Sequence, residues 1–147
     1  DAKAPDEVPE FRLLHCLRTL GGQPSEFRME DVPPAETIAA YLTELAGRSD
    51  PARTVYLIHA PPYDTPLDLM YGRRHVGSRA IAQFCRDHQP WLTLHGHIHE
   101  TVHLSKSFRH SWGRGTSASC GNQPIQEAVA VVEGDLAAPD TWQRAVV

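Results

Sequence analysis

The sequence contains few cysteines and no closely spaced pair of them. Cys16, Cys85 and Cys120 are odd in number and far apart. This pattern argues against a disulfide framework and is typical of reduced thiols in a cytoplasmic protein. Because no Cys-x-x-Cys pair is present, a thiolate zinc finger is not expected either.

Long apolar runs and an excess of basic residues are also absent. No segment is apolar over the length needed to cross a bilayer, and none has the pattern of a signal peptide. The formal net charge is −4 with histidines neutral, so nothing indicates a site for nucleic-acid phosphates. Small phosphate esters remain possible ligands, because bound metals can supply positive charge. The 147 residues suit a lead-in over 1–10 and a single domain over 11–147.

Histidine, in contrast, is concentrated in one short stretch. His95, His97 and His99 directly follow the apolar run 91–94, which predicts a buried strand. In an extended chain His97 and His99 point the same way, and Gly96 allows a sharp turn or a close approach. His-x-His is a ready chelate for zinc, iron or manganese. The alternative is a solvated loop that happens to be rich in histidine.

A second apolar run, over residues 54–58, also ends in a histidine, His59, and a proline turn follows at once. Sheets of parallel strands place their sites beyond the carboxyl ends of the strands. The sequence therefore predicts that His59 lies close to His97 and His99 at the rim of a shared cavity. Asp64, a few residues further on, is a candidate to orient a ligand imidazole.

The order His-Ala-Pro-Pro-Tyr (59–63) followed by Gly-His-x-His (96–99) resembles the C-terminal half of the calcineurin-like metallophosphoesterase family. The resemblance implies a four-layer α/β/β/α sandwich, of which this chain would supply roughly half. It also implies two divalent metal ions (manganese, iron or zinc), with His59 and His97 on one and His99 on the other. The full-length protein would then hydrolyse a phosphate mono- or diester.

The family's carboxylate ligands are missing from this chain. They belong to Asp-x-His, Gly-Asp and Gly-Asn-His elements, and residues 1–58 contain none of these. Neutral imidazoles alone would leave two dications without balancing charge. We therefore expect the chain, which begins at Asp1, to be a piece of a longer enzyme rather than a degenerate relative, and to be inactive or nearly so by itself. The family's general acid belongs to the missing part, so no catalytic residue is assigned.

The polar loop over residues 60–77 is the candidate substrate-binding segment, because a loop of this length without its own structure is often functional. Arg73, Arg74 and His75 could meet a substrate phosphate, each arginine through a bidentate fork. The alternative for these three is solvated surface charge. His95 is either a substrate-facing or supporting group, or simply a packed strand residue.

Apolar periodicity predicts an α/β fold, a mixed β-sheet flanked by helices. Ser78 is a candidate N-cap and Gly47 a candidate helix stop. We expect helices over 35–46 and 78–88, and strands over 11–17, 54–59, 91–94, 108–112 and 128–133. The small, polar residues 116–122 resemble the short strand and loop that follow the last ligands in the metallophosphoesterase family.

Two other classes of protein compete with a phosphoesterase. A cupin-like mononuclear metal enzyme also uses His-x-His, although Glu100 stands too close to His99 for that pattern and the predicted helices suit a β-barrel poorly. A non-catalytic domain with one structural zinc would need a fourth ligand, for which His103 is the nearest candidate. If half a sandwich stands alone, its exposed apolar face should favour a homodimer.

Overall fold

The computed structural model describes residues 16–27, 33–123 and 129–147. Most of the predicted strand over 11–17 lies outside these residues. The elements follow one another as β1 (Cys16–Leu20), β2 (Gln23–Phe27), α1 (Ile38–Arg48), β3 (Val55–Leu57), β4 (Leu69–Met70), β5 (Arg74–His75), α2 (Arg79–His88), β6 (Leu92–His95), α3 (Thr101–Ser105), β7 (Arg109–Ser111), β8 (Thr116–Ser119), β9 (Ala130–Glu133) and β10 (Gln143–Val146).

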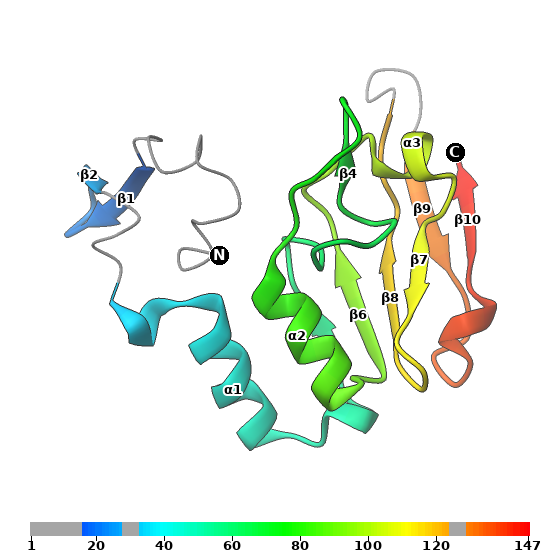
Figure 1. The fold of residues 1–147 in the computed structure, drawn as a ribbon, viewed down its shortest axis with the longest axis horizontal. Helices are drawn as coiled ribbons and strands as arrows, with labels where there is room; N and C mark the ends of the chain where they lie inside the picture. Colours follow the sequence, from blue (N-terminus) through cyan, green and yellow to red (C-terminus); the bar gives the residue numbers. More distant parts are fainter. Residues whose placement is uncertain (1–15, 28–32, 124–128) are drawn as a thin grey trace.

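A four-stranded mixed sheet, in the order β3-β6-β8-β7, positions the candidate site (Figure 1). Strands β3, β6 and β8 are parallel, and β7 runs antiparallel to β8. The predicted α/β fold with a mixed sheet is confirmed, and it differs from the β-barrel of a cupin. The pairing of Leu57 with Leu94 brings the carboxyl ends of β3 and β6 to the same edge.

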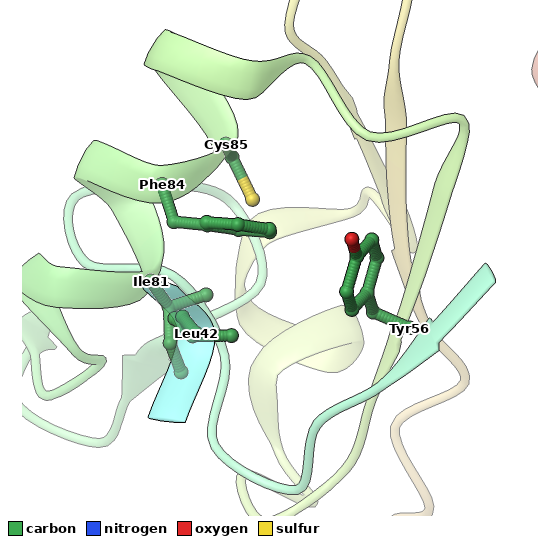
Figure 2. Packing of buried hydrophobic residues seen from close by; sticks show 5 residues of the cluster. All are labelled: Leu42, Tyr56, Ile81, Phe84 and Cys85. Atoms are coloured by element: carbon green, nitrogen blue, oxygen red, sulfur yellow. The ribbon is translucent and has the colours of Figure 1, made fainter. Parts of the chain in front are cut away.

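Helices α1 and α2 pack against the sheet through one apolar cluster (Figure 2). Leu42 of α1 and Phe84 of α2 are buried together with Tyr56 of β3. The Tyr56 and Phe84 rings meet edge to face with their centroids 5.2 Å apart, a favoured aromatic geometry. Tyr56 can join this core because alternate residues of a strand point to opposite faces, which leaves Leu57 79% exposed.

Strand β3 lies at one end of the sheet order, and no described strand pairs with its outer edge. The homodimer prediction depends on exposed apolar surface, and Leu57 on the unpaired strand β3 provides such surface. The homodimer stays a prediction. Among the described ranges, no helix combines the length and the apolar character that crossing a bilayer requires.

The predicted boundaries hold for α2 and shift for α1. The Ser78 hydroxyl accepts a hydrogen bond from the Ile81 N–H at 3.3 Å, so Ser78 is the N-cap of α2 as predicted. Helix α1 begins only at Ile38, because the Thr37 hydroxyl caps it by accepting from the Ala40 N–H at 3.2 Å. The prediction that Gly47 ends this helix is wrong: α1 continues through Gly47 to Arg48.

Replacing Gly47 by alanine should therefore stabilise the protein by about 0.5–1 kcal/mol. A Cβ there would meet nothing within 4 Å, and the backbone is helical. Gly72 is the matched control, because it has equally open surroundings but a φ of +80°, where alanine is strained. Urea unfolding should show Gly47→Ala raising and Gly72→Ala lowering the free energy of unfolding. A loss of stability with Gly47→Ala would contradict the helical role of this position.

Four segments contain elements that the sequence patterns did not predict. The loop over 60–77 contains the short antiparallel pair β4–β5, and residues 101–105 form α3. The C-terminal residues 143–146 form β10, which pairs antiparallel with β9. Residues 23–27 form β2, which pairs antiparallel with β1.

Candidate functional site

The structure brings His59 and His97 together at the carboxyl edge of the sheet. His97 Nδ1 lies 3.2 Å from His59 Nε2, and the ring centroids are 5.0 Å apart. Both residues are exposed. Each follows one of two adjacent parallel strands, β3 and β6, and the Gly96 N–H donates to the His59 carbonyl at 3.0 Å. This is the juxtaposition predicted from the two strand ends.

The separation of these nitrogens suits two ligands of one metal ion. Nitrogens bound at about 2.0–2.1 Å lie roughly 2.9–3.4 Å apart when the angle at the ion is about 90–109°. The observed 3.2 Å falls within this range. In the structure the two nitrogens share a hydrogen bond, so one ring donates an N–H to the other. Imidazole coordinates through either ring nitrogen, and an ion bound by both rings would take the place of the shared proton.

The third predicted ligand, His99, is not part of this pair. It is exposed, and its carbonyl accepts a hydrogen bond from the Asn122 N–H at 2.8 Å. Within the described ranges, no group of three or more histidine, cysteine or acidic side chains converges closely enough to hold an ion. The described part of the chain therefore contains a pair of neighbouring histidines rather than a complete metal site, and His103 does not join this pair there.

The backbone at this site has an unusual conformation at His97 and not at Gly96. His97 has a φ of +66°, a left-handed conformation that is uncommon outside glycine. A Cβ at Gly96 would lie 3.5 Å from His59 Nδ1, which is an ordinary van der Waals contact. The structure therefore requires glycine at position 96 neither for a close approach nor for a turn, and the left-handed backbone falls on His97 instead. Such conformations often occur at functional sites.

His95 points into the protein, and both of its ring nitrogens have protein partners. Nδ1 lies 3.0 Å from the Ile58 carbonyl oxygen and 2.8 Å from that of Ala60, and Nε2 lies 2.7 Å from Thr93 Oγ1. The residue is 8% exposed. Burial lowers the pKa of His95 to about 4, so the ring is neutral at pH 7. Its contacts match the packed alternative rather than a substrate-facing group.

A chain of hydrogen bonds leads from His95 across the sheet. Thr93 Oγ1 lies 2.5 Å from Ser117 Oγ, and Ser117 accepts from the Trp112 indole N–H at 2.7 Å. Cys85 Sγ lies 3.9 Å from the same serine oxygen, and burial raises the pKa of this thiol to about 11. A thiol with so high a pKa is a poor nucleophile, and Cys85 is one of the buried residues of the apolar cluster.

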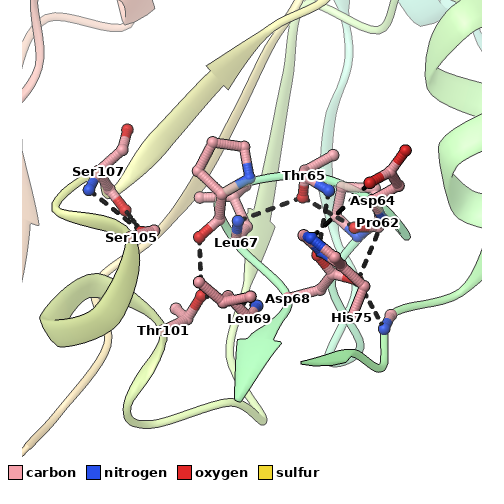
Figure 3. A network of polar contacts seen from close by, with 12 residues as sticks. Pro62, Asp64, Thr65, Leu67, Asp68, Leu69, His75, Thr101, Ser105 and Ser107 are labelled. Atoms are coloured by element: carbon pink, nitrogen blue, oxygen red, sulfur yellow. Dashed lines mark hydrogen bonds and ion pairs between the residues drawn. The ribbon is translucent and has the colours of Figure 1, made fainter. Parts of the chain in front are cut away.

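The loop after His59 is held by a buried carboxylate, Asp68, which is 0% exposed (Figure 3). Its oxygens accept hydrogen bonds from the N–H groups of Asp64, Thr65 and Gly77 at 2.9–3.1 Å. His75 Nδ1 lies 2.6 Å from Asp68 Oδ1. Hydrogen bonds to Asp68 therefore give the loop over residues 60–77 a defined structure.

The predicted substrate contacts of this loop lie in different surroundings. Arg73 and Arg74 are exposed, and Arg73 has a φ of +58°. His75 Nε2 lies 3.7 Å from an Asp64 carboxylate oxygen, so this ring stands between two acids. Neighbouring carboxylates oppose the approach of a phosphate to His75. The substrate role of these three residues stays a prediction.

No protein-family model, curated protein or solved structure matches the chain. The resemblance to metallophosphoesterases therefore rests on the short motifs themselves.

Proposed function

We propose that this chain supplies histidine ligands to a two-metal phosphoesterase centre. In this proposal His59 and His97 bind one metal ion and His99 binds the other. The 3.2 Å approach of His59 and His97 at the ends of neighbouring parallel strands is the observation that carries it. The exposure of both rings supports it further, because an ion and a phosphate ester can reach them from solvent.

The proposed reaction is hydrolysis of a phosphate mono- or diester by the full-length protein. Two bound cations, manganese, iron or zinc, would neutralise phosphate oxygens and activate a water molecule. His59 and His97 would hold and orient one ion as neutral ligands. Because they bring no negative charge, carboxylates beyond this pair must balance the metals. The 147-residue chain alone should therefore be inactive or nearly so.

Zinc binding to the isolated chain is the direct test of the ligand pair. We expect binding at neutral pH that weakens at least about tenfold in His59→Ala and in His97→Ala, since each change removes one ligand. Competition against a chromophoric chelator measures the affinity. His103→Ala is the matched control, because this exposed histidine lies outside the pair. Absence of zinc binding, or equal binding by both ligand variants and wild type, would overturn the proposal.

Activity separates the two-metal proposal from its rivals. With manganese and bis-p-nitrophenyl phosphate, the isolated chain should show almost no turnover, and the full-length protein should hydrolyse the diester. Robust turnover by the isolated chain would contradict the expected need for further carboxylates. A metal-dependent rise in unfolding temperature, with no hydrolysis by the full-length protein, would favour the structural zinc alternative.

A further inference from the structure

We propose that His95 is a positioning residue, whose ring fastens the backbone on both sides of His59 to the strand that leads to His97. These hydrogen bonds of His95 are present in the metal-free fold. Only their effect on metal affinity rests on the proposed function. The sequence left a supporting role for His95 open, and the structure adds the partners of its ring.

Three successive carbonyls around His59 bond to the dipeptide that precedes His97. The carbonyl oxygens of Ile58 and Ala60 lie 3.0 and 2.8 Å from His95 Nδ1. The carbonyl between them, that of His59, accepts from the Gly96 N–H at 3.0 Å. Strand β3 ends at Leu57, so this segment lies beyond the named strand. Residues 95 and 96 thus fix the stretch that presents the His59 ring.

The two carbonyls at Nδ1 assign the tautomer of His95. A carbonyl oxygen can only accept, so Nδ1 carries the proton, and Nε2 of the neutral ring accepts from the Thr93 hydroxyl. The Thr93 hydroxyl has one proton, so it accepts from Ser117, which in turn accepts from the Trp112 indole N–H. Both ring nitrogens of the buried His95 therefore have partners of the right kind.

The effect expected on the site follows from the precision that a metal requires. To bind one ion, the nitrogens of His59 and His97 must stay near 3.2 Å apart. If the backbone around His59 can move, this distance varies over a wider range and the ion is held less often. Groups that orient metal ligands typically contribute about 10–100-fold to metal affinity. The Thr93 hydroxyl bonds His95 and Ser117 and neither of the two paired histidines, so its loss should reduce zinc affinity by a factor in this range.

Thr93→Val tests the inference, with Thr116→Val as the matched control. Both threonines are buried, but Thr116 pairs with Leu92 and lies outside the hydrogen-bond chain of His95. In metal-free protein we expect the Gly96 N–H to exchange with solvent at least about tenfold faster in Thr93→Val. The Trp91 N–H, bonded to the Pro51 carbonyl at the other end of the same strand, should be unchanged. His95→Asn should give the same pattern.

The outcomes separate this inference from the proposed function. Equal acceleration of the Gly96 and Trp91 amides would show a general loss of stability and overturn the positioning role. Unchanged Gly96 exchange in Thr93→Val would overturn it as well. If the wild-type chain binds no zinc, the proposed function fails while the exchange result still decides the positioning role. Weaker zinc binding in Thr93→Val, with wild-type binding in Thr116→Val, supports both.

Discussion

Asp68→Ala is expected to lower the free energy of unfolding by about 3–5 kcal/mol. The carboxylate is fully buried and accepts from three backbone N–H groups, those of Asp64, Thr65 and Gly77. Alanine would leave these donors, and the His75 ring, without their acceptor. Urea denaturation monitored by tryptophan fluorescence measures the loss.

Asp64→Ala is the control for this effect, because it removes an acid from the same loop. The Asp64 side chain is 75% exposed, and the substitution keeps the backbone N–H that Asp68 binds. We expect a change within about 0.5 kcal/mol. Similar small effects of both substitutions would mean that the loop does not depend on the buried carboxylate.

The second large effect is a loss of stability at acidic pH that originates at His95. Its pKa falls from 6.5 to about 4 on folding, because the folded protein buries the ring. Between these values the unfolded chain binds the proton and the folded protein does not, so stability rises with pH. The contribution is complete above pH 6.5 and is lost as pH falls toward 4. Its size is about 3 kcal/mol.

Comparison of wild type with His95→Asn isolates this contribution. The variant should be less stable at pH 7, and its stability should fall by about 3 kcal/mol less between pH 7 and pH 4. Burial also lowers the pKa of His110, which contributes in the same direction to both proteins and cancels in the comparison. Urea titrations in the presence of chelator provide the data, with the exposed His88→Asn as control. Parallel pH profiles for wild type and His95→Asn would contradict the prediction.

Local signals predicted the parts of the fold that depend on neighbouring residues. Ser78 precedes an apolar periodic stretch, and its hydroxyl caps α2 as expected. The apolar run over 91–94 is the basis of β6. The approach of His59 and His97 was also predictable, because parallel strands bring equivalent ends together.

Features that depend on distant partners were not predictable in this way. The C-terminal β10 acquires its strand conformation by pairing with β9, and nothing in residues 143–146 alone indicates this partner. Asp68 was overlooked in favour of the nearby Asp64. Its position between Leu67 and Leu69 was the available signal, since an acid within an apolar run is expected to be buried with partners. The hydrogen bond between Thr93 and Ser117 could not be predicted without knowing that β6 and β8 pair in the register that places these two residues opposite each other.

The left-handed backbone at His97 has an evolutionary consequence. Glycine or asparagine adopts this conformation at less cost, and the difference is of order 1 kcal/mol. Under selection for folding alone, mutational drift would therefore tend to replace this histidine. Retention of the imidazole at this position in related sequences would therefore indicate selection for something other than stability.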